Sequence, residues 1–408
     1  MLLVQKFLET QMFADLAREH GVYASFSKSG HKFSLNYDQI EAKEADPLSQ
    51  ECRGLILSAE DGHVFTAQIS AEGRPKYDHI CPGKTIILAY PMRRFFNMGQ
   101  GCAAEINWSD PNLAVLEKLD GTLCIVYYDP FTNQWCVATR SVPEADLLMD
   151  NGLFTFRTLF EKAVQDTCGY DFHTLTKSMS PYYTYCFELC TPYNRIVVDY
   201  KTNNITLLAV RHLATFQELE FNNPLIEKLA NNGVPLVQAH TYTSIDELVD
   251  WVATLNPMKH EGIVVRDRHF NRIKIKNAAY CAANKLRDTL GSSPRNCLEL
   301  ILLGKEDDAM SFLPPDIADN LILIKEKYRI WLEEQERMYK KVFEESSVIN
   351  AGDKKTFALT LNKYTTAFKP AYFTIFSGKA ISVKDFIEKN RKDGSWSDSF
   401  LDKILSVI

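Results

Sequence analysis

Short runs of strand-forming residues fill the chain between about residues 50 and 280, and they constrain its fold more than any other feature. The runs are rich in Val, Ile, Tyr and Thr, and turn residues separate them, which is typical of strands in a mostly antiparallel architecture. They are GLILSAEDG, TIILAY, LCIVYYD, QWCVATRS, YYTYCFELC, NRIVVDY, ITLLAVRH, GIVVRD and RIKIKN. Helical patterns occur between them, in NGLFTFRTLFEKAVQD and in SIDELVDWVATL, which Ser244 is expected to cap. We therefore predict an α+β fold for residues 1–280.

The pattern changes after about residue 280. The segment ADNLILIKEKYRIWLEEQERMYKKVFEESS has apolar residues at helical spacing along one stripe and charged residues on its other faces. The stripe consists of Leu321, Ile324, Tyr328, Trp331, Met338 and Val342. No β-rich segment follows, so we predict an all-helical C-terminal domain over residues 281–408. Two domains also agree with the length of 408 residues, which is long for one compact domain.

Composition excludes several classes of protein. A hydrophobic fraction of 46% and an aromatic fraction of 12% exclude a disordered chain. The N-terminal segment MLLVQKFLETQMFADLAREHGV is typical of an amphipathic helix rather than a signal peptide, and no window of about 18 apolar residues predicts a membrane span. Ten cysteines without a CxxC pair are typical of free thiols in a reducing cytosol, so we expect a cytoplasmic protein. The net charge of -6 argues against a nucleic-acid coat protein, but it is compatible with an enzyme that binds nucleic acid through a local basic surface.

The segment LEKLDGTLCIVYYD places Lys118 just ahead of an Asp-Gly pair and a strand-like run. A lysine acts as a nucleophile only when neutral, and its ordinary pKa of about 10.4 prevents this at neutral pH unless burial or neighbouring cations lower it. Asp120-Gly121 suits a tight turn, because glycine tolerates positive φ and aspartate can bond its own backbone. The tetrapeptide alone favours a solvated lysine beside a turn. The alternative is a reactive lysine that faces a pocket.

Charged residues on other strand-like runs favour the reactive lysine. In RIKIKN, Lys274 and Lys276 alternate with isoleucines, so both cations point to one face, where an anion or solvation at a sheet edge would offset their repulsion. Glu188 in YCFELC is a carboxylate within an apolar run and is costly to bury without a partner. Further charged and aromatic residues begin other segments: Arg53, Arg93, Arg94, Phe95, Phe96 and Glu261. This set predicts a nucleoside-triphosphate pocket, because cations neutralise phosphates and carboxylates bind a ribose hydroxyl or a divalent metal.

The ordered motifs also resemble those of a known family. KLDG (residues 118–121), CFELCTPYNRIVV, LLAVR, HEGIVV and KIK resemble the motifs of the covalent nucleotidyltransferase superfamily of ATP-dependent ligases and capping enzymes. ECRG, PMRRFFN, the FEL…PYNRIV run and KIKNAAY are similar to the RNA ligase 1 family of T-even bacteriophages, from about residue 33 into the C-terminal domain. The resemblance implies an antiparallel-sheet nucleotidyltransferase domain (an ATP-grasp-like, adenylyltransferase ligase domain) over residues 1–280. The helical domain over residues 281–408 would then recognise structured RNA.

The resemblance implies that the chain joins RNA 5′-phosphate and 3′-hydroxyl ends with ATP, through lysine-AMP and RNA-adenylate intermediates. Lys118 would be the nucleophile that attacks the α-phosphorus of ATP and carries AMP. Glu261 and Asp307 would hold Mg²⁺, with Mn²⁺ as an alternative. The implied nucleotide-binding positions are Arg53, Arg94, Phe96, Glu117, Arg140, Glu188, Lys274, Lys276 and Tyr280. The implied partners are RNA ends, such as those of a nicked tRNA anticodon loop, and the chain would act as a monomer without a membrane.

The chain departs from the family pattern at a few positions, and alternatives remain. Arg94 stands where the family has a lysine, Leu35 replaces a family tyrosine, and the stretch EGRPKYDHICPGKT has no family counterpart. The alternatives are a DNA ligase or capping guanylyltransferase, an inactive nucleic-acid-binding relic, and an α+β protein with chance motifs. The helical pattern after residue 280 argues against the first, since those enzymes normally carry a β-barrel OB domain there. The retained lysines and glutamates argue against the second.

Overall fold

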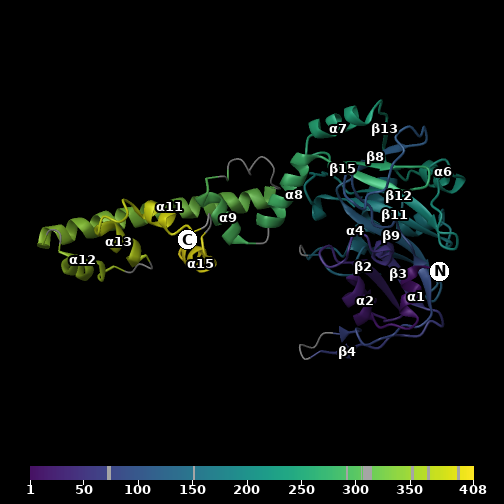
Figure 1. The fold of residues 1–408 in the computed structure, drawn as a ribbon, viewed down its shortest axis with the longest axis horizontal. Helices are drawn as coiled ribbons and strands as arrows, with labels where there is room; N and C mark the ends of the chain where they lie inside the picture. Colours follow the sequence, from purple (N-terminus) through teal and green to yellow (C-terminus); the bar gives the residue numbers. More distant parts are fainter. Residues whose placement is uncertain are drawn as a thin grey trace. The chain divides into compact units, whose positions relative to one another are not determined.

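The computed structural model describes residues 1–70, 75–149, 152–290, 293–304, 306, 315–350, 353–364, 368–392 and 396–408 (Figure 1). The chain forms two compact units, Met1–Tyr280 and Cys281–Ile408. None of the helices in the described ranges is long and apolar enough to cross a membrane.

The described residues of the first unit form four β-sheets, with strand orders β1-β2-β3-β6, β10-β9-β11-β12, β13-β8-β14-β15-β7 and β4-β5. Among the described strands, neighbours pair antiparallel except that β7 runs parallel to β15. This confirms the prediction of an α+β unit built on antiparallel sheets. The strands are β1 Val22–Phe26, β2 Lys32–Tyr37, β3 Arg53–Ala59, β4 Gln68–Ile69, β5 Pro75–Lys76, β6 Thr85–Ala89, β7 Phe96–Asn97, β8 Ala114–Lys118, β9 Thr122–Asp129, β10 Gln134–Thr139, β11 Tyr183–Cys190, β12 Asn204–His212, β13 Ala239–His240, β14 Gly262–Arg266 and β15 Arg272–Lys276.

Several helices cover apolar sheet faces of the first unit. Helix α4 (Phe156–Cys168) buries Leu159 and Phe160 against the β10-β9-β11-β12 sheet. Helix α7 (Ile245–Thr254) begins after Ser244, whose side chain accepts a hydrogen bond from the Glu247 amide, as predicted, and it packs on strands β8, β14 and β15. The other helices of this unit are α1 Leu3–Leu8, α2 Phe13–His20, α3 Pro47–Glu51, α5 Phe172–Thr176 and α6 Pro224–Asn231, with a 3₁₀ turn at Pro192–Asn194.

Two local predictions are wrong. The N-terminal segment forms two helices rather than one, because the chain turns after Leu8 and the Asp15 carboxylate then accepts a hydrogen bond from the Met12 amide at the start of α2. The run NRIVVDY is not a strand. The amide groups of Val197 and Val198 donate to Oδ2 of Asp120, at 2.9 and 2.7 Å, so they do not take part in a sheet ladder.

The described elements of the second unit are helices. The longest, α11 (Pro315–Asn350), contains the predicted apolar stripe, and Trp331 on this stripe packs in a core with Phe357, Phe368 and Tyr372. Met338 of the stripe is only partly buried. The other helices are α8 Ala278–Leu290, which begins at the end of the first unit, α9 Pro294–Leu302, α12 Lys354–Leu361, α13 Lys369–Phe376, α14 Val383–Lys389 and α15 Asp398–Leu405.

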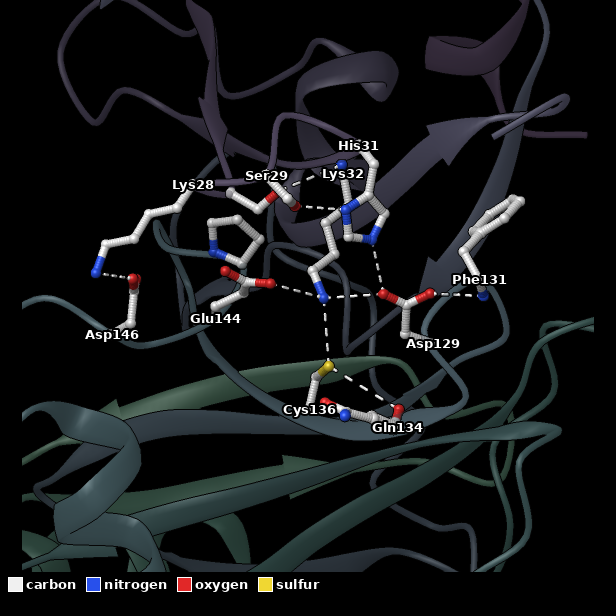
Figure 2. Close-up of polar contacts among 12 residues, drawn as sticks. Lys28, Ser29, His31, Lys32, Asp129, Phe131, Gln134, Cys136, Glu144 and Asp146 are labelled. Atoms are coloured by element: carbon white, nitrogen blue, oxygen red, sulfur yellow. Dashed lines mark hydrogen bonds and ion pairs between the residues drawn. The ribbon is translucent and has the colours of Figure 1, made fainter. Parts of the chain in front are cut away.

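A buried polar cluster joins the two four-stranded sheets of the first unit (Figure 2). Lys32 of β2 is 1% exposed, and its Nζ lies 3.0 Å from Oδ2 of Asp129, 3.0 Å from Oε1 of Glu144 and 3.3 Å from Sγ of Cys136. His31 also contacts Asp129, with Nε2 2.8 Å from Oδ2. Burial opposes ionisation of Asp129, but the hydrogen bonds from His31 and Lys32 outweigh it and lower its pKa to about 2. The sheets are therefore linked by a charged pair that persists at neutral pH.

We predict that Lys32→Met lowers the free energy of unfolding by about 3 kcal/mol or more, because it leaves the Asp129 carboxylate buried without its ammonium partner. Urea denaturation at pH 7 measures this change. Since the pKa of Asp129 is depressed, the stabilisation by its ionised form is present above its unfolded pKa of about 4 and is lost as the pH falls through about 2.

The matched control is the double variant Lys32→Met/Asp129→Asn, which removes both charges and should recover part of the lost stability. A single variant that unfolds at the wild-type urea concentration would show that the cluster does not stabilise the contact between the sheets.

Candidate active site

Three neighbouring strands bring the predicted lysines together. Gly262 of β14 lies opposite Lys118 of β8 on one side and opposite Lys276 of β15 on the other. Because side chains alternate along a strand, Lys274 and Lys276 share one face of β15. Ile273 and Ile275 point to the other face, where they are buried under α7. The sheet therefore has an apolar face packed on a helix and an opposite face that carries the cations.

Gly262 allows these strands to approach closely. Its φ is +145°, a backbone conformation that L-residues rarely adopt. A Cβ atom at this position would lie 2.3 Å from the carbonyl oxygen of Ile275 and 2.8 Å from Cα of Lys276. Only a glycine fits between β8 and β15 at this point, so the spacing of the lysines depends on it.

Glu261, directly before β14, binds two of the lysines. Its Oε2 lies 2.6 Å from Nζ of Lys118, and its Oε1 lies 2.7 Å from Nζ of Lys276. The carboxylate is 5% exposed and the Lys118 side chain is 20% exposed. Lys118 is thus mostly buried and forms an ion pair with a residue far along the chain. A solvated lysine beside a turn would have neither property.

Glu188 lies beside the Lys118 turn, in the middle of β11. Its Oε1 accepts a hydrogen bond from the Gly121 amide at 3.1 Å. Burial raises the pKa of Glu188 to about 7, and the nearby Glu261 adds to this rise, whereas Lys118 and Arg53 oppose it. A carboxylate that titrates near neutral pH is a strong hydrogen-bond acceptor for a hydroxyl group when ionised.

Asp120 anchors the turn after Lys118. Its Oδ1 accepts a hydrogen bond from the Tyr280 hydroxyl at 2.6 Å, and its Oδ2 accepts from the amides of Val197 and Val198. Asp120 and Tyr280 are each 2% exposed. The sequence predicts only a local turn role for Asp120, and the family resemblance implies a nucleotide contact for Tyr280. The structure places the Tyr280 hydroxyl on this carboxylate, a long-range pairing that the spacing of the motifs does not reveal.

Arg53 and Lys274 lie over the ring of Phe95, with the guanidinium carbon 5.3 Å and Nζ 5.0 Å from its centroid. Burial lowers the pKa of Lys274 to about 7, and the neighbouring Lys118, Arg53 and Lys276 lower it further. Burial also lowers the pKa of Arg53, and its Nη1 is buried without a hydrogen-bond partner among the described residues. Desolvated cations and an unpartnered N–H donor fit an anion such as a phosphate.

The remaining predicted residues lie in different surroundings. The Arg94 guanidinium stacks 4.2 Å from the ring of Tyr37 and 5.1 Å from that of Phe96, and Arg140 lies 5.7 Å from the same Tyr37 ring. Tyr37 was missed, since nothing in its run marks it as a platform for cations.

One predicted position, Glu117, points away from the lysines. Oε1 of the Glu117 carboxylate lies 3.1 Å from Nδ1 of His260, and within the part of the chain that the structure describes no hydrogen bond or ion pair joins it to the lysines. Strand alternation explains this, because residue 117 points away from the face that Lys118 occupies. Asp307 lies outside the described residues.

The carboxylates of this site fit a metal that binds together with phosphates. Among the described residues, no three His, Cys, Asp or Glu side chains are grouped so that they could hold a metal ion. Mg²⁺ usually takes one or two protein carboxylates and completes its shell with phosphate and water oxygens. Glu261 could supply a protein oxygen to such an ion.

Sequence comparison finds that this chain is similar to RNA ligases. A family model described as RNA ligase matches residues 51–280. An RNA ligase of Rhodothermus phage RM378 is 27% identical over 398 residues, covering 80% of this chain and 88% of the relative. A bifunctional polynucleotide kinase/RNA ligase of Autographa californica nuclear polyhedrosis virus is 26% identical over 295 residues, covering 69% of this chain and 37% of that protein. An archaeal ATP-dependent RNA ligase structure aligns with a TM-score of 0.44 at 15% identity, covering 96% and 93% of the two chains.

We predict that Gly262→Ala lowers the free energy of unfolding by at least about 2 kcal/mol, because the methyl group must displace β15 and the backbone strain adds to the clash. Urea denaturation measures the loss. The matched control is Gly99→Ala, at φ +81° with no atom within 4 Å of the added Cβ, which should cost only about 1 kcal/mol. Equal losses in the two variants would contradict the close approach of the strands as the reason for this glycine.

Proposed function

The chain belongs to the RNA ligase family, and from this premise we propose that it joins RNA 5′-phosphate and 3′-hydroxyl ends with ATP, using Lys118 as the nucleophile. The observation that carries the proposal is the position of Lys118, whose Nζ is 2.6 Å from Glu261 in a cluster with Lys274, Lys276 and Arg53. The family match, with its named relatives, decides against a DNA ligase or a capping enzyme.

The first step transfers AMP to Lys118. The bond between Nζ and the α-phosphorus of ATP forms, the bond from that phosphorus to the β-phosphate oxygen breaks, and pyrophosphate leaves. The ammonium must first lose a proton, and Oε2 of Glu261 is the carboxylate oxygen that already accepts its hydrogen bond. Lys276 binds the other oxygen of Glu261, at 2.7 Å, so the carboxylate that faces Lys118 is also held from its far side.

The cations then stabilise the charge that develops on the phosphates. Such transfers need little acid–base chemistry, and most of their catalysis comes from positioning and electrostatic stabilisation. The unpartnered Nη1 of Arg53 and the desolvated Lys274 are suited to phosphate oxygens. A divalent cation, Mg²⁺ in our proposal, would supply further charge neutralisation when held by Glu261 and the phosphates.

The second and third steps use the same site. The RNA 5′-phosphate attacks the phosphorus of lysine-AMP and releases the amine, which gives RNA-adenylate. The RNA 3′-hydroxyl then attacks the 5′-phosphorus, and AMP leaves. A bare phosphate monoester has no leaving group better than oxide, which is why AMP has to be attached first. In this proposal Glu188, whose Oε1 accepts a hydrogen bond from the Gly121 amide beside Lys118, would also accept hydrogen bonds from the ribose of AMP in each step.

We also propose that residues 1–280 form the adenylyltransferase domain and that residues 281–408 recognise structured RNA, such as a nicked tRNA anticodon loop. Support for the division comes from the two compact units and from the separate apolar core of the second, around Trp331 and Phe357.

We predict that Lys118→Ala abolishes covalent labelling by ATP that carries ³²P at the α-phosphate, because the acceptor amine is absent. The measurement is incubation with magnesium followed by denaturing electrophoresis. Sealing of RNA that already carries a 5′-adenylate should persist in part, since that step needs no lysine nucleophile.

The matched control is the Lys28→Ala protein. Lys28 is 78% exposed and its Nζ lies 2.7 Å from Asp146, so this protein should be labelled like the wild type. A Lys118→Ala protein that still becomes labelled would disprove the assignment of the nucleophile. An unlabelled wild-type protein freed of bound AMP would favour an inactive relic.

We predict that ATP binding takes up a proton at pH 8. Lys274 has its pKa lowered to about 7, so at pH 8 about 0.9 of it is neutral, and adjacent phosphates raise its pKa so that it binds a proton. Calorimetric titration of the Lys118→Ala protein in two buffers of different ionisation enthalpy measures the uptake without turnover.

The control for this uptake is Lys118→Ala/Lys274→Met, in which most of the pH 8 uptake should disappear. Equal uptake in the two proteins would mean that another group titrates on binding.

A further inference from the structure

A cavity of about 590 Å³ lies beside the segment that leads into β7. Most of its wall comes from residues 93–96, Arg211, residues 216–218 and residues 268–272. Lys118, Glu188, Glu261 and Lys276 do not line it. The cavity therefore lies beside the lysine cluster and shares with the expected nucleotide-binding set only Arg94 and Phe96. Its volume is within the range of about 300–1,000 Å³ that is usual for ligand sites.

The wall of this cavity is strongly basic. Glu218 is the one carboxylate among the lining residues. Five arginines line the cavity: Arg93, Arg94, Arg211, Arg268 and Arg272. Since the whole protein has a net charge of -6, this concentration of positive charge is local rather than a property of the surface in general.

Glu218 does not neutralise the cavity. Its Oε1 lies 2.6 Å from Nη2 of Arg211, and its Oε2 lies 2.5 Å from Nη2 of Arg272. Burial opposes its ionisation, but Arg272 and Arg211 outweigh it and lower the pKa of Glu218. The ionised carboxylate holds two arginines, so the group of three keeps a net positive charge. Nε of Arg211 remains buried without a hydrogen-bond partner among the described residues.

Two aromatic residues of the wall have strained backbones. Phe216 has φ +60° and Phe270 has φ +63°, in the left-handed region that bulky residues rarely adopt. Each such residue costs about 1–3 kcal/mol, and strain of this kind gathers at functional sites. Four non-glycine residues of the described chain have positive φ, and two of them line this one cavity. The Phe216 ring packs edge-on against Tyr90, and the Phe270 ring has the Arg266 guanidinium 4.8 Å from its centroid, so both strained residues have their rings fixed by neighbours.

Phe95 connects the cavity to the proposed reaction site. It lines the cavity, and its ring also lies 5.0 Å from Nζ of Lys274 and 5.3 Å from the guanidinium carbon of Arg53. A nucleic-acid strand bound in the cavity would therefore only have to pass the Phe95 side chain to reach the cations around Lys118.

We propose that this cavity binds a single-stranded stretch of the RNA substrate next to the end that reacts, with the arginines on its phosphates and the phenylalanine rings available to its bases. The inference rests on the proposed function and names the part of the site that holds the substrate strand. Arginine forks match phosphate oxygens, and the combination of basic groups with aromatic faces is the usual way to hold single strands without reading their sequence.

The test compares two exposed, ion-paired arginines. Arg268 is 60% exposed, lines the cavity, and has its Nε 3.4 Å from Asp110. Arg18 is 65% exposed, is paired with Asp15, and does not line the cavity. The full-length Arg268→Ala and Arg18→Ala proteins are titrated without ATP against a fluorescent, 5′-phosphorylated, single-stranded RNA of 12 nucleotides, at several salt concentrations.

We expect Arg268→Ala to raise the Kd for this RNA several-fold and to reduce the slope of log Kd against log salt by about 0.7, the change for one lost phosphate contact on a single strand. Arg18→Ala should match the wild type in both quantities. Labelling of both variants by α-³²P ATP should be unchanged. A second variant, Phe270→Gly, relieves the backbone strain and should also weaken RNA binding, with little change in the salt slope.

Two outcomes would overturn the inference. In the first, the wild type is labelled by ATP and seals RNA, but Arg268→Ala keeps the wild-type Kd and salt slope, so the proposed function stands without this cavity. In the second, Arg268→Ala binds RNA normally but needs more ATP for labelling, which would assign the cavity to nucleotide phosphates. Failure of the wild type to be labelled would instead disprove the proposed function.

Discussion

The carboxylate of Glu261 holds together the group of side chains on which the site depends. Lys118 and Lys276 lie on the two strands that flank Gly262, and their ammonium groups would repel each other without the buried carboxylate between them. Moving one of these side chains away would leave a buried charge without its partner, which is costly. The ion pairs therefore keep the three side chains in place. Even so, four cations (Lys118, Lys274, Lys276 and Arg53) face two carboxylates (Glu261 and Glu188), and the excess charge suits a triphosphate.

The apolar side of the same sheet gives this cluster its rigidity. Ile263, Ile273 and Ile275 pack with Leu248 and Val252 of α7, so the strands that carry the lysines cannot slide by one residue without moving isoleucines into the charged face. The turn after Lys118 is fixed separately, by the bonds from Asp120 to Tyr280 and to the segment after the 3₁₀ turn. Packing on one face and buried hydrogen bonds on the other thus place one lysine accurately.

Local patterns predicted much of the fold, and long-range pairing explains what they missed. The alternation in RIKIKN places its lysines and isoleucines on opposite faces, as the structure has them, because strand geometry alone decides this. The same rule shows why Glu117 does not join the lysines. NRIVVDY has the composition of a strand, but a carboxylate some 77 residues earlier binds its amides. Nothing in the local sequence marks that carboxylate, nor the pairing of Gly262 with two lysines.

The two basic regions differ in the cation they use, and the difference follows from chemistry. Around Lys118 the cations are mainly lysines, and burial can bring a lysine such as Lys274 to a pKa of about 7, so that protons can be released or taken up during a reaction. In the cavity beside Phe95 they are arginines, which stay charged in almost any surroundings and present a rigid fork to phosphate. A side chain that exchanges a proton with its substrate must be able to lose its charge. A side chain that only holds a polyanion must keep its charge. In our proposal the lysines on one side of Phe95 serve the reaction, and the arginines on its other side hold the RNA strand.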